Sequence, residues 1–192
     1  MTSLPPNLPR RRTPIMQKIG VLGMRLFGWR LEGELPNVAK AVIIVAPHTS
    51  NWDFFMGLFA DLALDLKASW LGKHSIFVWP VKGLLLSLGG VPIQRGSNKN
   101  YVDQLVEEFA TRDALVLAIA PEGTRKRVTQ WRTGFYHIAR GAQVPIVMVG
   151  LDYARKVVAL GPVFNPTGDV DADLAALKAH FTQYTARFPD QY

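Results

Sequence analysis

The chain has 192 residues, of which 48% are hydrophobic, which is enough for one domain with a substantial core. It contains no cysteine, which excludes disulfides, thiolate metal sites and a thiol nucleophile. The formal net charge is +7, and residues 1–40 hold seven Lys and Arg against two Glu. This basic start indicates an anionic partner, such as a lipid surface, a phosphorylated substrate or nucleic acid.

The N-terminal part divides into two predicted segments. Residues 1–14 contain four prolines and three consecutive arginines and predict a mobile basic arm. Residues 15–31 predict an amphipathic helix, which either lies in a membrane interface or simply packs on the domain. Its apolar stripe consists of Ile15, Ile19, Leu22 and Leu26. Because no apolar run approaches ~20 residues and no cleavage site follows, we expect an unprocessed chain that does not cross a membrane.

The rest of the chain alternates short apolar runs with amphipathic segments. The runs predict strands at 41–45, 68–71, 91–94, 114–120, 144–151 and 156–160. The amphipathic segments predict helices at about 51–66, 77–88, 99–112, 133–140 and 171–187. This alternation predicts that residues 32–192 form a single α/β domain, with a largely parallel, mixed sheet flanked by helices.

His48 and Asp53 stand where the strand at 41–45 ends and the next helix begins. In one continuous helix, residues five apart would point about 140° away from each other. The two side chains therefore meet only if His48 lies in the turn. An imidazole with a carboxylate on one nitrogen can take a proton on the other, as a general base does. Ser50 and Asp53 also fit a capping box, in which Asp53 would serve only the helix start, so both interpretations stay open.

Other chemically active residues also follow predicted strands. Arg95 comes just after the strand at 91–94, and Arg125 follows the strand at 114–120. In parallel α/β sheets, ligands bind beyond the carboxyl ends of the strands. Together with His48, these residues place three reactive groups at one sheet edge, which is more than a helix cap requires.

Four stretches, in this order, resemble the glycerolipid acyltransferase family, the group that includes the 1-acyl-glycerol-3-phosphate acyltransferases. They are His48-Thr49-Ser50-Asn51-Trp52-Asp53 (the His-x4-Asp block), Gly72-Lys73 through Pro80, Gly83 and Gly90 to Val91-Pro92-Ile93-Gln94-Arg95, Pro121-Glu122-Gly123-Thr124-Arg125 (the Glu-Gly-Thr-Arg block), and Val144-Pro145-Ile146-Val147. The match covers roughly residues 40–150. One block alone is a weak signal, whereas four in order are specific.

The resemblance implies transfer of a fatty acyl group from acyl-CoA or acyl carrier protein to the hydroxyl of a lysophospholipid. It implies no metal, cofactor or covalent intermediate. By this analogy His48 is the base that takes the hydroxyl proton, and Asp53 holds its tautomer. Lys73, Arg95 and Arg125 match the family's positions for the acceptor phosphate, which Arg binds well in a bidentate manner.

The resemblance also assigns the block around Glu122 and Gly123 to substrate binding. Glu122 would orient either the Arg125 loop or the acceptor. Backbone amides or the Thr124 hydroxyl would stabilise the oxyanion that forms on the thioester carbonyl. The implied location is the cytoplasmic, inner face of the cell membrane, with peripheral attachment to an anionic lipid surface.

Several alternatives have distinct sequence requirements. An acyltransferase for another lipid acceptor, for example of the ornithine-lipid type, would keep the same blocks. A non-catalytic lipid-binding protein would explain the first helix but not the blocks. A serine hydrolase would need a Gly-x-Ser-x-Gly elbow, which is absent. We expect no nucleic-acid partner, because the basic excess is concentrated at the start and does not form a stripe with stacking aromatics.

Overall fold

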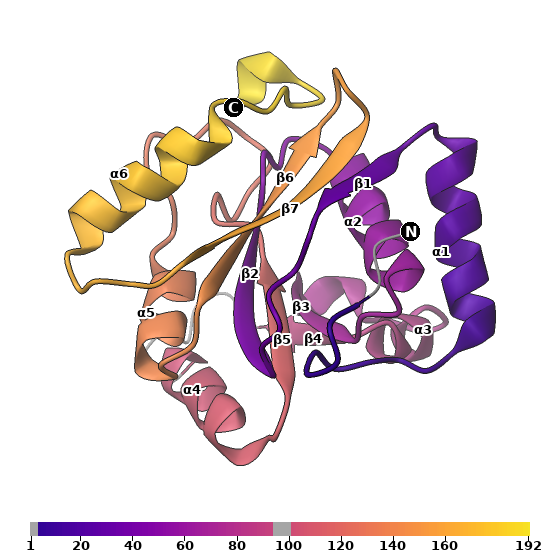
Figure 1. Cartoon of the computed structure of the whole chain (residues 1–192), viewed down its shortest axis with the longest axis horizontal. Helices are drawn as coiled ribbons and strands as arrows, with labels where there is room; N and C mark the ends of the chain where they lie inside the picture. The colour runs from indigo at the N-terminus through magenta and orange to yellow at the C-terminus, as the bar shows by residue number, and fades with distance from the viewer. Residues whose placement is uncertain (1–3, 94–100) are drawn as a thin grey trace.

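The computed structural model of the chain describes residues 4–93 and 101–192, and its centre is one seven-stranded sheet (Figure 1). The strand order is β1-β7-β6-β2-β5-β3-β4. The strands are β1 (Arg30–Gly33), β2 (Lys40–Ala46), β3 (Ala68–Lys73), β4 (Gly90–Ile93), β5 (Leu115–Ile119), β6 (Ile146–Asp152) and β7 (Val157–Phe164). Neighbouring strands are parallel except β6 and β7, which are antiparallel. The predicted single α/β domain with a largely parallel, mixed sheet is confirmed.

Helices cover both faces of this sheet. They are α1 (Pro14–Leu26), α2 (Asn51–Ala63), α3 (Lys82–Ser87), α4 (Tyr101–Thr111), α5 (Gly134–Gly141) and α6 (Val170–Phe181). In Figure 1, α1, α2 and α3 lie on one side of the sheet and α4, α5 and α6 on the other. None of the helices in the described part of the chain is long and apolar enough to cross a membrane.

The central strand β2 is buried on both faces, which explains its unbroken apolar sequence. Its side chains alternate between two core clusters. Ala41 and Ile43 pack with Met24 and Met56 beneath α1 and α2. Val42 and Ile44 belong instead to the cluster formed with α4, α5 and α6. The carboxyl end of β2 is therefore held rigidly from both sides.

Helix α1 packs on α2 through glycines rather than through its apolar stripe. A Cβ at Gly20 would lie 2.3 Å from the backbone N of Ala63, and one at Gly23 would lie 2.5 Å from the Phe59 ring. Only glycine allows the two helices to approach this closely. The predicted stripe faces solvent instead, with Ile15 72% and Leu26 73% exposed.

The prediction of a mobile arm over residues 1–14 does not hold for residues 4–14. Leu4 and Leu8 are buried in the core. The Arg11 guanidinium donates to Asp61 Oδ2, from Nε at 3.2 Å and Nη2 at 2.9 Å, and also to the backbone oxygen of Leu88. Burial raises the pKa of the Asp61 carboxyl, and the neighbouring charge of Arg11 opposes this rise. The segment is ordered because two leucines and one buried ion pair fix it.

Two other segments differ from the prediction. The helix expected over 15–31 ends at Leu26, because Gly28 adopts φ +71 and the chain continues as β1. The helix expected over 171–187 ends at Phe181, so Arg187 lies in an irregular segment. This segment returns toward the carboxyl edge of the sheet, where the backbone N of Phe188 donates to Thr49 Oγ1.

Candidate active site

The predicted site residues follow strands that end at one edge of the sheet. Ile43 of β2 is level with Ala118 of β5, which is level with Trp70 of β3. His48 and Glu122 lie in the loops that follow β2 and β5, and Lys73 is the last residue of β3. The parallel register therefore carries all three to the carboxyl edge, as ligand-binding residues of such sheets require.

His48 lies in the turn between β2 and α2, and Asp53 lies in the first turn of α2. His48 Nδ1 is 3.3 Å from Asp53 Oδ2. The Asp53 side chain is 1% exposed, whereas that of His48 is 24% exposed. This geometry leaves the second imidazole nitrogen, Nε2, available to a substrate. Contacts of this kind shorten when substrate binds, so the observed distance suits a general base before the reaction.

Asp53 serves the helix start as well as the histidine. Its Oδ2 accepts hydrogen bonds from the backbone N of Thr49 and of Ser50, both at 2.7 Å. The Ser50 hydroxyl in turn accepts from the backbone N of Trp52 at 3.1 Å. These bonds form the capping box. The two interpretations of Asp53 are compatible, because a single carboxylate holds the turn and contacts His48.

Glu122 joins the His48 turn to the end of β5. Its Oε1 accepts from the backbone N of His48 at 2.9 Å, while Oε2 is buried and has no hydrogen-bond partner among the described residues. Burial raises the pKa of the Glu122 carboxyl to about 6. The carboxyl of Glu122 therefore fixes the backbone of the His48 turn from inside the protein.

The loop after Glu122 turns at Gly123, whose φ of +65 favours glycine. Thr124 Oγ1 accepts from the backbone N of Lys126 at 3.4 Å, so its hydroxyl takes part in this turn. Arg125 is exposed. It lines a polar groove together with Thr124 and Thr49, and the cationic side chains of Lys126 and Arg127 extend this groove.

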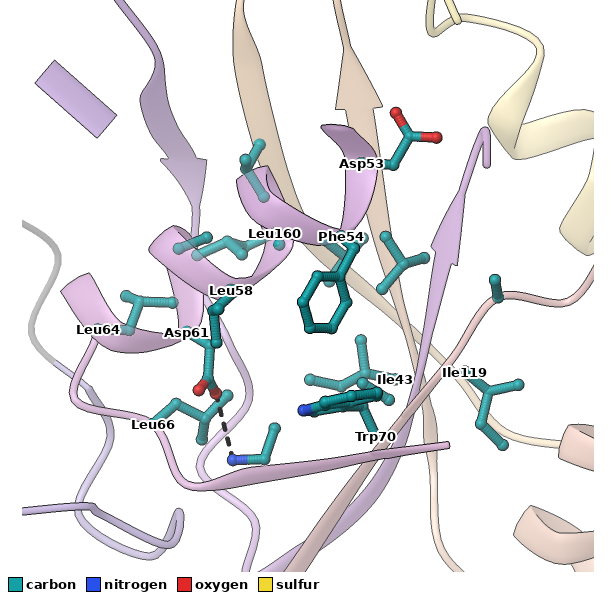
Figure 2. Close-up of a pocket in the computed structure, with 18 of the residues that line it drawn as sticks. Ile43, Asp53, Phe54, Leu58, Asp61, Leu64, Leu66, Trp70, Ile119 and Leu160 are labelled. Atoms are coloured by element: carbon teal, nitrogen blue, oxygen red, sulfur yellow. Dashed lines mark hydrogen bonds between the residues drawn. The ribbon is translucent and has the colours of Figure 1, made fainter. Parts of the chain in front are cut away.

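An apolar cavity of about 200 Å³ lies between α2 and the sheet, and His48 and Asp53 line it (Figure 2). Its walls come from Phe54 and Leu58 of α2 and from Trp70 of β3. In Figure 2, Asp53 and Asp61 lie at opposite ends of the lined region, with apolar side chains between them. The candidate base, which contacts Asp53, therefore borders an apolar cavity.

The structure does not bring all of the predicted phosphate-binding residues together. Lys73 is exposed at the end of β3 and lines neither the cavity nor the groove. Because β5 separates β3 from β2, Lys73 stands about 10 Å to the side of the His48 strand. Arg95 lies outside the described residues. Arg125 is therefore the predicted cation that shares a groove with the His48 turn.

Two residues near the dyad were not predicted from the sequence. Tyr153 donates its hydroxyl proton to Asp53 Oδ1 at 2.6 Å. The guanidinium of Arg187 lies 5.7 Å from the centre of the Tyr153 ring and 5.4 Å from that of Trp52. Tyr153 directly follows β6, so its position after a strand was a usable signal. Arg187 had no such signal in the sequence, because its segment was predicted to be part of a helix.

Within residues 4–93 and 101–192, no group of three or more His, Asp or Glu side chains is arranged to hold a metal ion. The side chains gathered at the dyad are an imidazole, two carboxylates and a phenol. They can accept and donate protons and can bind hydroxyl or amide groups.

Comparisons with known proteins point to one family. A model of the family described as Acyltransferase matches residues 24–152. The chain is 32% identical over 120 residues to the chloroplastic 1-acyl-sn-glycerol-3-phosphate acyltransferase of Brassica napus, covering 59% of this chain and 35% of that protein. It is 28% identical over 150 residues to the 1-acyl-sn-glycerol-3-phosphate acyltransferase of Escherichia coli, covering 73% of this chain and 60% of that protein.

The fold has a counterpart among solved structures. It is similar to the crystal structure of the 1-acyl-sn-glycerophosphate acyltransferase PlsC from Thermotoga maritima, with a TM-score of 0.64 and 17% sequence identity. The superposed region covers 91% of this chain and 81% of that one. The family match includes the His48 turn, the Glu122 loop and strands β2 to β6. On this evidence the chain belongs to the acyltransferase family.

Proposed function

We propose that this protein transfers a fatty acyl group from a thioester donor, acyl-CoA or acyl carrier protein, to the hydroxyl of 1-acyl-glycerol-3-phosphate or a similar lysophospholipid. The observation that carries the proposal is the His48–Asp53 pair at one end of an apolar cavity. A base alone suits many reactions, whereas a base beside an apolar cavity suits a substrate with a hydrocarbon chain. The plant and bacterial relatives are 1-acyl-sn-glycerol-3-phosphate acyltransferases, which supports this acceptor.

The proposed reaction needs no group beyond this chain and its two substrates. His48 Nε2 takes the proton of the acceptor hydroxyl, and the oxygen attacks the thioester carbonyl carbon. Collapse of the tetrahedral intermediate breaks the C–S bond, and the imidazolium returns its proton to the departing sulfur. Asp53 stabilises the imidazolium, and backbone amides or Thr124 stabilise the oxyanion.

Charged side chains bind the phosphate of the acceptor in this proposal. Arg125 is assigned this role because it shares a groove with Thr49, next to His48. Lys73, which is exposed at the end of β3, is assigned the same role only by the family resemblance. Glu122 is buried and lines neither the cavity nor the groove, so in this proposal it holds the His48 turn through the backbone N of His48.

A donor and acceptor screen tests the proposal. Purified protein is given radiolabelled acyl-CoA or acyl carrier protein of several chain lengths, with 1-acyl-glycerol-3-phosphate, glycerol 3-phosphate or a lyso-ornithine lipid as acceptor. We expect labelled diacyl product with the first acceptor. Product formed only with the ornithine lipid would identify a different acceptor. Absence of transfer to all three would refute the enzyme assignment.

Gly57 offers a sharper test of the acyl cavity. It lines the cavity, and a Cβ at this position would have no atom within 4 Å. In Gly57→Leu the new side chain occupies space that a long acyl chain needs, and crowding of this kind costs about 1–3 kcal/mol, or roughly 5- to 150-fold in kcat/KM. We therefore expect long-chain donors to lose activity and short-chain donors to keep it.

Gly83→Leu is the matched control. Gly83 lies in α3, its Cβ would also have open space, and it does not line the cavity. Both variants replace a helical glycine by a better helix former, so neither should lower the unfolding temperature. Identical chain-length profiles for the two variants would contradict an acyl chain in this cavity.

We propose that the protein attaches peripherally to the cytoplasmic face of an anionic membrane, and the exposed stripe of α1 supports the attachment itself. Leu22 is 56% and Leu26 is 73% exposed, although both are large and apolar. The segment before α3 adds Trp79, which is 90% exposed. Figure 1 shows α1 and α3 on the same side of the molecule. Exposed apolar side chains beside Lys18 and Arg25 suit a helix in a lipid interface.

Vesicle sedimentation tests this attachment. The double variant Leu22→Glu/Leu26→Glu removes two apolar side chains, each of which contributes about 1.5–3 kcal/mol when buried in lipid. We expect the bound fraction on phosphatidylglycerol vesicles to fall by at least tenfold. Val163→Glu is the control, because Val163 is an exposed apolar residue on β7. An equal loss in the control, or no loss in the double variant, would contradict binding through α1.

A further inference from the structure

Tyr153 connects the dyad to the turn between β6 and β7. Its hydroxyl donates to Asp53 Oδ1 at 2.6 Å, while Oδ2 of the same carboxylate receives two backbone amides and faces His48. The two carboxylate oxygens therefore have separate partners. The Tyr153 hydroxyl donates to Oδ1, the carboxylate oxygen that does not face His48.

The Tyr153 ring is held on several sides. The Trp29 ring meets it edge-on, with centroids 4.8 Å apart and an interplanar angle of 85°. The Arg187 guanidinium lies 5.7 Å from the ring centroid. The backbone N of Tyr153 donates to the oxygen of Thr185 at 2.9 Å. A ring packed in this way presents its hydroxyl in one direction, toward Asp53.

The phenol has two physical effects on the carboxylate. It fixes the rotation of the Asp53 carboxyl, so that Oδ2 stays toward His48. It also draws negative charge toward Oδ1, which lowers the negative charge on Oδ2, the oxygen next to the imidazole. Burial and the neighbouring Asp53 raise the pKa of the Tyr153 hydroxyl, so it remains a donor throughout the physiological range.

We propose that Tyr153 is a positioning residue for the acyl transfer. It orients the Asp53 carboxylate and weakens the attraction between this carboxylate and the His48 imidazolium. This inference rests on the proposed function. Tyr153 acts through Asp53 and has no contact with the reacting atoms. The charged and titratable groups that face the dyad are Glu122 from the loop after β5 and Arg187 from the C-terminal segment. Asp152, the neighbour of Tyr153, accepts instead from the backbone of its own turn.

Tyr153→Phe removes the hydroxyl and keeps the ring on Trp29, so the variant is expected to fold. A hydrogen bond to a charged group contributes about 1.5–3 kcal/mol, which corresponds to a loss of roughly 10- to 150-fold in kcat. KM for both substrates should stay within about twofold of wild type. The acid limb of kcat/KM should move to higher pH, because Asp53 then holds the imidazolium more strongly.

Tyr136→Phe is the matched control within the same chain. The Tyr136 hydroxyl donates to the buried Asp173 at 2.7 Å, on the sheet face covered by α5 and α6. It is the same type of bond, remote from the cavity. We expect this variant to lose stability with no shift in the pH profile. Equal effects of the two variants on kcat and on the acid limb would overturn the proposal.

A second readout separates this inference from the proposed function. The NMR titration of the His48 imidazole needs no substrate, and its midpoint should move to higher pH in Tyr153→Phe but not in Tyr136→Phe. An unchanged midpoint in Tyr153→Phe would refute the role of Tyr153 even in an active enzyme. A shifted midpoint in a protein that transfers no acyl group would refute the proposed function alone.

Discussion

His48→Ala should lower kcat for acyl transfer by about 10²–10⁴-fold, because the acceptor hydroxyl loses the group that takes its proton. The fold should be retained. The backbone N of residue 48 still donates to Glu122, and the imidazole is the partly exposed member of the dyad. The measurement is single-turnover transfer of a radiolabelled acyl group, with circular dichroism to establish folding.

His137→Ala is the control for this experiment. His137 is exposed on α5, on the opposite side of the sheet from the cavity. Its removal should leave turnover within about twofold of wild type, as expected for a surface residue outside the site. A folded His48→Ala protein with nearly normal turnover would exclude His48 as the general base.

Asp53→Asn should lower kcat by a similar factor, about 10²–10⁴-fold, and should also destabilise the protein. The amide has one acceptor oxygen, whereas the carboxylate accepts from Thr49, Ser50 and Tyr153 and contacts His48. Its NH₂ group would face at least one of these donors, and an unsatisfied buried polar group costs about 1–3 kcal/mol. An amide also fails to stabilise the imidazolium or its tautomer.

Ser50→Ala separates the two roles of Asp53. The Ser50 hydroxyl caps α2 by accepting from Trp52 N, so its loss should cost about 1 kcal/mol in urea unfolding. It makes no contact with His48 in the described structure, so kcat should hardly change. If Ser50→Ala lost as much turnover as Asp53→Asn, the aspartate would act through the helix start alone.

The sequence predicts the parts of this fold that depend on local patterns. The apolar run of β2 indicates a strand buried on both faces, and the strand-to-helix turn brings His48 toward Asp53. The polar groups at the carboxyl edge follow from strand order in α/β sheets. These features need only neighbouring residues and general rules of topology.

The features that escaped prediction depend on residues far apart in the chain. A segment rich in proline and arginine reads as mobile, yet Arg11 finds a buried partner in Asp61, 50 residues later. Likewise, Asp53 and its donor Tyr153 are 100 residues apart. The orientation of α1 is set by Gly20 and Gly23. Glycines do not contribute to an apolar stripe, so the sequence pattern gave no sign of this contact.

Helix α2 carries both the proposed catalytic carboxylate and part of the cavity wall. Its first turn carries Asp53 and the cavity residue Phe54, its middle lines the cavity through Leu58, and Asp61 near its end forms an ion pair with Arg11. In the proposed reaction, the carboxylate that assists the base and the side chains that contact the acyl chain thus belong to one helix. We expect substitutions that move α2 relative to the sheet to change turnover and acyl-chain preference together. Substitutions that only change side chains lining the cavity should change the preference alone.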